Sequence, residues 1–183
     1  MSYKVAILGH SQVPPIFPDI PGTDIRVFRK PGAHLRLVHE YPDFSSVFSW
    51  EHHHNIIFLG GNDIDIYPRA PTAEDLATQL IDLCRHFHAL GQTNHLCEIE
   101  PRQYSHPPLQ SAYNTIQHNV NRRLVRYARN NGHLYMPIHF NTRLYSEGHG
   151  RDGVHFTYTI KEHITDKMVH AIMYARERYD TSQ

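Results

Sequence analysis

The chain has 183 residues, a length at which one domain buries most of its apolar surface around a single core. Its 18 Lys and Arg residues equal its 18 Asp and Glu residues, which excludes a general electrostatic attraction to nucleic acid or to anionic membranes. Two cysteines are too few for a disulfide framework, and no apolar run approaches the roughly 20 residues that a membrane-spanning helix needs. We therefore expect a single globular domain over residues 1–183.

Five short apolar runs predict buried strands. They lie at residues 5–8, 25–28, 56–59 and 96–99 and, more weakly, at residues 133–138. Runs this short and this apolar are typical of strands that are covered on both faces, as in a parallel sheet. The sequence thus predicts a mainly parallel, five-stranded sheet.

Three segments between and after these runs carry hydrophobic side chains at helical spacing, namely residues 72–90, 113–129 and 159–178. The first begins with Thr72, three residues before Asp75, as in an N-terminal capping box, and Gly91 suits its C-terminal end. A further helix is expected between residues 33 and 50. The alternation of strands and helices predicts an α/β sandwich.

Chemically useful side chains follow the predicted strands, and ligands of open parallel sheets bind at that edge. Ser11 follows the first strand, Gly32 the second and Asn62 the third, and Asp152 and His155 precede the last helix. An imidazole can take the proton of a Ser hydroxyl, and a carboxylate can orient that imidazole. The backbone N–H groups of Ser11 and Gly32 and the Asn62 amide are suited to stabilise an oxyanion.

The motifs around these residues resemble the four sequence blocks of SGNH (GDSL-type) hydrolases. They are, in chain order, Gly9-His10-Ser11, Gly32, Gly60-Gly61-Asn62-Asp63 and Asp152-Gly153-Val154-His155-Phe156. Each motif is common by itself, but the four occur in the family's order over nearly the whole chain. The resemblance implies a flavodoxin-like, three-layer α/β/α domain.

The resemblance also implies roles for these residues. Ser11 would be the nucleophile, His155 the base and Asp152 the group that orients it, with Gly32 and Asn62 joining Ser11 in the oxyanion hole. The expected activity is that of a carboxylic-ester hydrolase working through an acyl-enzyme, with no cofactor. The expected substrate is a small-molecule or lipid ester. Because the small size leaves little chain for a lid, short-chain esters such as acetyl esters are favoured.

Two further residues near the predicted site are candidates for substrate binding. The family usually has Asp before the nucleophile, where this chain has His10, so His10 is a candidate for substrate binding. Arg102 follows the fourth predicted strand at the same edge of the sheet, and it could bind an anionic group of a substrate, brace the loop or form a structural ion pair. Residues 99–102, taken together with the motifs at residues 31–33, 61–63 and 152–155, form a pattern that is similar to that of esterase domains carried by some animal non-LTR retrotransposons.

The alternative to an enzyme is a non-catalytic binding module on this scaffold, serving for example the nucleoprotein of a mobile element. Four arginines lie on one predicted helix, at positions 122, 123, 126 and 129. No aromatic stacking platform accompanies them, so a solvated face is favoured and nucleic-acid binding by this domain is not expected.

Histidine is abundant, at 17 residues, but no metal site is expected. The consecutive side chains of His52, His53 and His54 point in different directions, and no acidic or Cys partner lies at zinc-motif spacing. The first residues lack the apolar run of a signal peptide, and free thiols suit a reducing compartment, so the expected location is the cytoplasm.

Overall fold

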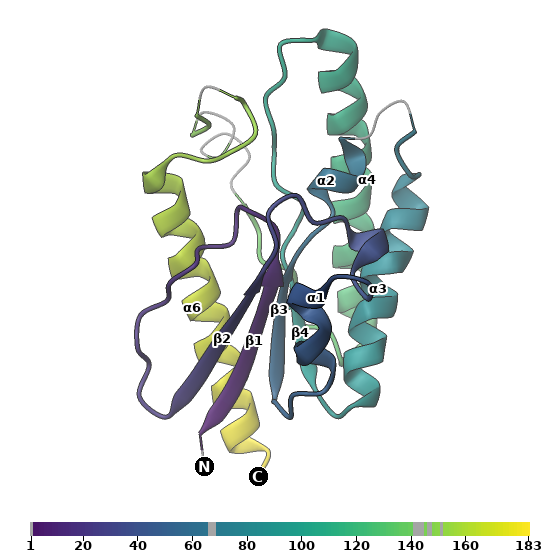
Figure 1. Cartoon of the computed structure of the whole chain (residues 1–183). Helices are drawn as coiled ribbons and strands as arrows, with labels where there is room; N and C mark the ends of the chain where they lie inside the picture. Colours follow the sequence, from purple (N-terminus) through teal and green to yellow (C-terminus); the bar gives the residue numbers. More distant parts are fainter. Residues whose placement is uncertain (1, 66–68, 141–144, 146–147, 151) are drawn as a thin grey trace.

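The computed structural model of the protein describes residues 2–65, 69–140, 145, 148–150 and 152–183. Its central sheet is parallel, and the strands β1 (Tyr3–Gly9), β2 (Thr23–Arg29), β3 (His54–Phe58) and β4 (Thr93–Leu96) lie in the order β2-β1-β3-β4. All four point toward the same end of the molecule, so their carboxyl ends share one edge (Figure 1). The predicted parallel sheet is therefore confirmed, with four strands in place of five.

The predicted fifth strand is present only as an extended segment beside β4. Two isolated parallel bridges join it to the sheet region, Asn94 to Leu134 and Cys97 to Ile138. Pro137 lies between these bridges and has no N–H to donate, so the ladder is interrupted there. The strand predicted from the apolar run at residues 96–99 begins three residues earlier in the structure, because β4 starts with polar side chains.

Helices cover both faces of the sheet. Helices α3 (Ala73–Ala89) and α4 (Pro107–Asn130) lie on one face and α6 (Tyr158–Thr181) lies on the other, which gives three layers (Figure 1). Thr72 caps α3 by accepting the N–H of Asp75 at 3.1 Å, as the sequence predicts. Helix α4 begins six residues before the predicted start, because two prolines are well tolerated in a first helical turn.

The helix expected between residues 33 and 50 is present only as short pieces. Three short pieces replace it: η1 (Leu35–Leu37), α1 (Pro42–Ser45) and η2 (Ser46–Phe48). Pro42 forces the preceding residue, Tyr41, into an extended conformation with ψ 125°, so a helix cannot run through this point. A short helix that the sequence did not predict, α2 (Gly61–Ile64), follows β3.

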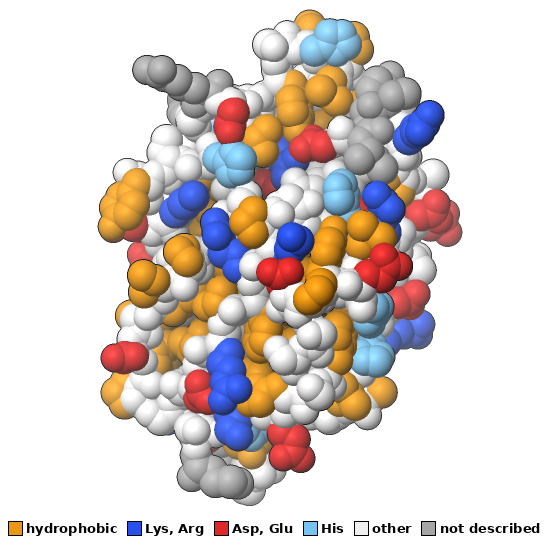
Figure 2. Space-filling view, in the orientation of Figure 1, with side chains coloured by type: hydrophobic (Ala, Val, Ile, Leu, Met, Phe, Trp, Pro, Cys, Tyr) orange, Lys and Arg blue, Asp and Glu red, His pale blue; other side chains and the backbone are white. Residues whose placement is uncertain are grey.

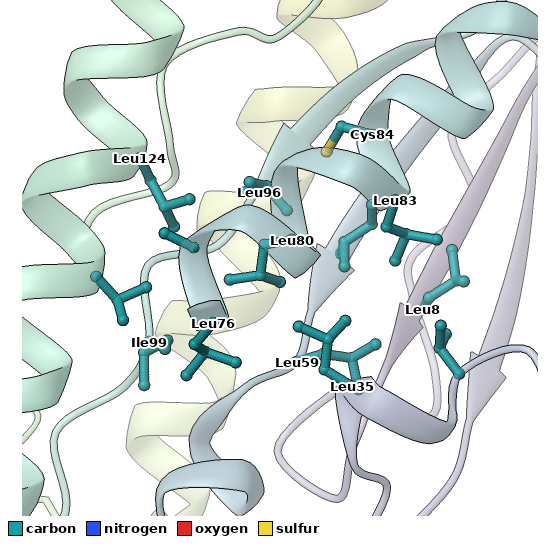
Figure 3. Close-up of a cluster of buried hydrophobic side chains, with 14 of the residues drawn as sticks. Leu8, Leu35, Leu59, Leu76, Leu80, Leu83, Cys84, Leu96, Ile99 and Leu124 are labelled. Carbon is teal, nitrogen blue, oxygen red and sulfur yellow. The ribbon is translucent and has the colours of Figure 1, made fainter. Parts of the chain in front are cut away.

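The alternation of side chains along the strands divides the core into two clusters. Leu8, Ile57 and Leu59 pack with α3 and α4, whereas Ile7 and Ile56 pack with α6. Figure 3 shows leucines of α3 filling the first cluster against the sheet. Full burial of one such side chain contributes about 2 kcal/mol to folding. The rigid sheet thus holds the loops at its carboxyl edge in place.

The surface carries charges of both signs. On the face seen in Figure 2, basic and acidic side chains are interspersed with hydrophobic ones. The four arginines of α4 are exposed to solvent. Among the described residues, no helix combines the length and the apolar character that crossing a membrane requires.

Candidate active site

Ser11, His155 and Asp152 form a hydrogen-bonded chain at the carboxyl edge of the sheet. Ser11 Oγ lies 3.0 Å from His155 Nε2, although the two residues are 144 positions apart in the sequence. His155 Nδ1 lies 2.5 Å from Asp152 Oδ2. If Nδ1–H is donated to the carboxylate, Nε2 is left to accept the Ser11 proton. This is the geometry that a serine nucleophile and its base require.

The carboxylate of Asp152 is held by its own loop. Its Oδ1 accepts the backbone N–H groups of Val154 and His155, each at 2.9 Å, while Oδ2 contacts the imidazole. These hydrogen bonds, with that of the His155 side chain the strongest, hold the pKa of Asp152 well below its ordinary value. Asp152 is therefore ionised at neutral pH and suited to stabilise an imidazolium at His155.

Gln12 links the nucleophile loop to the loop of His155. Its Nε2 donates to the carbonyl of Val154 at 2.5 Å, and its Oε1 accepts the N–H of Phe156 at 3.2 Å. One side chain thus holds the residues on both sides of His155, directly after Ser11. Sequence reasoning missed Gln12, because its partners lie more than 140 positions away and no motif marks them.

Gly153 brings the loop of Asp152 and His155 (residues 152–155, the acid–base loop) against the loop that follows β4. The N–H of Gln103 donates to the Gly153 carbonyl at 2.7 Å, and His149 Nε2 lies 2.8 Å from the Pro101 carbonyl. A Cβ on Gly153 would lie 1.8 Å from the carbonyl oxygen of Gln103, and its φ is +68°, so only glycine fits this contact. The Asp152-Gly153 pair is therefore required by packing as well as by the turn.

The two other predicted oxyanion donors lie on the segments that follow β2 and β3, and a hydrogen bond joins these segments. Gly32 adopts φ +74°, which favours glycine, in the loop after β2. Asn62 lies in α2, after β3, and its Nδ2 donates to the Ala33 carbonyl at 2.9 Å. This bond joins the Gly32 loop to α2. The second N–H of the Asn62 amide has no acceptor among the described residues.

His10 and Arg102, the two candidates for substrate binding, are both buried. His10 is 0% exposed, its Nδ1 accepts the N–H of Gln12, and its Nε2 lies 3.3 Å from Glu100 Oε1. Arg102 is 3% exposed and donates to Glu100, Asp65 and Asn62. Neither side chain is accessible to a substrate in this arrangement. Of the three roles open to Arg102, its contacts favour bracing and ion pairing.

The three consecutive histidines at positions 52–54 each contact a different partner. His52 contacts Asn55, His53 accepts the N–H of Lys4, and His54 contacts His95. In the described part of the chain, no three His, Cys, Asp or Glu side chains are grouped as a metal site would need. The three consecutive imidazoles serve separate structural hydrogen bonds.

No protein-family model and no curated protein sequence matches the chain. Solved structures do match its fold. A member of the lipolytic G-D-S-L family from Veillonella parvula is 13% identical, with a TM-score of 0.71, and the match covers 92% of this chain and 97% of that one. A GDSL-like lipase from Bacteroides thetaiotaomicron is 18% identical, with a TM-score of 0.67 and coverage of 94% and 88%.

An acetyl xylan esterase is similar in the same way. It is 14% identical, with a TM-score of 0.67, and the match covers 92% of this chain and 98% of the esterase. These identities are low, and the likeness concerns the three-dimensional arrangement of the elements. The chain therefore has the α/β fold of solved SGNH and GDSL-type hydrolases, as the order of its sequence motifs predicts.

Proposed function

We propose that the protein hydrolyses carboxylic esters through an acyl-enzyme on Ser11. The observation that carries this proposal is the continuous chain of contacts from Ser11 Oγ through the His155 ring to Asp152, at 3.0 and 2.5 Å. The fold it shares with solved lipases and an esterase supports the same class of reaction.

In the first half of the reaction, His155 Nε2 takes the Ser11 proton while Ser11 Oγ attacks the ester carbonyl carbon. The resulting oxyanion accepts hydrogen bonds from the Ser11 and Gly32 backbone N–H groups and from Asn62. The carbon–oxygen bond to the alcohol then breaks, and the protonated His155 gives its proton to the leaving alkoxide. Asp152 stabilises the imidazolium throughout.

In the second half, water replaces the alcohol. His155 takes a proton from water, the hydroxide attacks the acyl carbon, and Ser11 Oγ leaves with the proton from His155. The carboxylic acid is released and the enzyme is restored. We expect short acyl groups, such as acetyl, to suit the site best, because the side chains of His155 and Asp152 are about half exposed, at 49% and 52%.

Hydrolysis of p-nitrophenyl acetate tests the proposal. The Ser11→Ala variant should lose at least about a thousandfold in kcat/KM, as expected when a triad nucleophile is removed. Ser49→Ala, which changes an exposed Ser remote from the triad, should keep the wild-type rate. Full activity in Ser11→Ala, or no turnover by the wild-type protein, would contradict the assignment, and the latter would favour a non-catalytic module.

The similarity of the motifs to retrotransposon esterase domains remains a prediction. It rests on residues 99–102 together with the catalytic motifs.

A further inference from the structure

The loop that follows β4 contacts three of the four segments that carry the candidate site, those of Ser11, Asn62 and Asp152. Glu100 Oε1 lies 3.3 Å from the ring of His10, the neighbour of Ser11. Arg102 Nη2 donates to Asn62 Oδ1 at 3.0 Å. The N–H of Gln103 donates to Gly153, beside Asp152, at 2.7 Å. Residues 100–103 are therefore the common support of the nucleophile, the oxyanion amide and the acid–base loop.

Within this loop, Arg102 is fixed by the buried carboxylate of Glu100. Nε and Nη2 of Arg102 both donate to Glu100 Oε1, at 3.2 and 2.9 Å, and Glu100 is 0% exposed. Nη1 donates to Asp65. A guanidinium held on three of its nitrogens has little freedom to rotate. Its direction toward Asn62 is therefore set by the fold.

The contact with Arg102 fixes which end of the Asn62 amide faces the site. A guanidinium only donates hydrogen bonds, so it pairs with the oxygen of the Asn62 amide and not with its nitrogen. With Oδ1 held by Arg102, Nδ2 donates one hydrogen to the Ala33 carbonyl at 2.9 Å. The second hydrogen is left for a ligand. Reversing the amide would place N–H groups of Asn62 against those of Arg102.

The glycine before Asn62 makes this contact possible. A Cβ at position 61 would lie 2.4 Å from Glu100 Oε1 and 2.8 Å from Arg102 Nη2. Any side chain there would push the Glu100–Arg102 pair away from α2.

We propose that Arg102 is a positioning residue, which holds the Asn62 side-chain amide so that its free N–H points to the oxyanion, with Glu100 locking the guanidinium in place. The inference rests on the proposed ester hydrolysis and deepens it. Because an oxyanion forms only in the transition state, the effect belongs in kcat and not in KM.

A double-mutant cycle on p-nitrophenyl acetate hydrolysis tests this role. Arg102→Met should lower kcat by about 10- to 100-fold, within the loss that removal of one oxyanion donor causes, and leave KM within about twofold. In the Asn62→Ala background, Arg102→Met should cause no further loss, because the residue through which it acts is gone. Losses that multiply, or an unchanged kcat in Arg102→Met, would overturn the proposal.

Two further variants separate positioning from folding. Arg102→Met leaves Glu100 buried without its partner, so the pair Glu100→Gln with Arg102→Met removes both charges together and should show the same loss in kcat. Arg176→Met is the matched control. Arg176 also holds a loop, by donating to Pro21 and Thr23, but it lies away from the site, and its loss should leave kcat unchanged.

A readout without catalysis distinguishes this proposal from the proposed function. The side-chain amide signals of Asn62 in a ¹H–¹⁵N spectrum are identified by their absence in Asn62→Ala. They should shift and exchange faster with solvent in Arg102→Met, while the amide of Asn55, at the other edge of the sheet, stays unchanged. Unchanged Asn62 signals would overturn the role of Arg102. A wild-type protein without Ser11-dependent hydrolysis, but with the shifted signals, would overturn only the proposed function.

Discussion

At the scale of single residues, the contact between Ser11 and His155 depends on side chains that take no part in the proposed reaction. Gln12 is 1% exposed and is bonded to the neighbours of His155 on both sides. Arg29 supports the same loop from β2, by donating to the carbonyls of Ser11 and Val13 at 3.1 and 2.9 Å. The distance of 3.0 Å between Ser11 and His155 is therefore set by backbone contacts that these side chains make.

Replacing Gln12 should reduce catalysis more than it reduces binding. Gln12→Met keeps the size of the side chain but removes both hydrogen bonds to the His155 loop, and a misplacement of about 1 Å costs about 100-fold in rate. We expect kcat for p-nitrophenyl acetate to fall by about 10- to 100-fold. Gln92→Met is the control, since Gln92 is also buried and bonded but lies at the opposite edge of the sheet. Equal effects of the two variants on kcat would contradict this role.

The order of the motifs in the chain was enough to predict that Ser11, Asp152 and His155 lie together, because each lies in a loop at the carboxyl edge of the sheet or before the last helix. Gln12 and the burial of His10 and Arg102 could not be predicted in this way. Their partners come from distant loops, and a sequence pattern does not reveal whether a polar side chain beside a site points into the site or into the core.

At the scale of elements, helices with regular spacing and caps were predictable, and segments with an internal proline were not. Helix α3 matches the prediction because its hydrophobic spacing, its Thr72 cap and the positive φ of Gly91 all agree. The segments at residues 33–50 and 133–138 carry suitable hydrophobic residues, but Pro42 and Pro137 interrupt their hydrogen bonding.

The cap of α3 can be tested by itself. Thr72→Ala removes the acceptor of the Asp75 N–H, so the free energy of unfolding should fall by about 1 kcal/mol. Thr115→Ala, in the exposed interior of α4, removes no cap and should change it by less than about 0.5 kcal/mol. Urea denaturation measures both. A similar destabilisation by the two variants would show that the cap contributes nothing particular to α3.

At the scale of the whole molecule, buried histidines make stability depend on pH. His54 Nε2 lies 2.7 Å from His95 Nδ1, and both rings are buried at the edge of the sheet away from the candidate site. Burial lowers the pKa of His95 from 6.5 to about 4, and burial together with the charge of His95 holds the pKa of His54 well below 6.5. The folded protein thus keeps both rings neutral.

The sign of the effect follows from proton binding. Below pH 6.5 the unfolded chain binds protons that the folded protein excludes. The contribution of the neutral rings to stability is therefore fully present above this pH and is lost as the pH falls toward about 4. His95 alone should lower the free energy of unfolding by about 2 to 3 kcal/mol between pH 7 and pH 4.5.

Urea denaturation at these two pH values checks this prediction. His95→Gln should reduce the fall in stability, whereas His163→Gln, which changes an exposed ring on α6, should retain all of it. If the two variants showed the same pH dependence, burial of His95 would not be its cause.

The account depends most on whether Ser11 is a nucleophile that His155 activates. Intact-protein mass spectrometry after treatment with a fluorophosphonate measures this directly, with peptide mapping to locate the adduct. We expect one adduct per chain, on Ser11, formed rapidly by the wild-type protein, much more slowly by His155→Ala and not at all by Ser11→Ala. An adduct on another residue, or labelling of His155→Ala at the wild-type rate, would contradict the central claim.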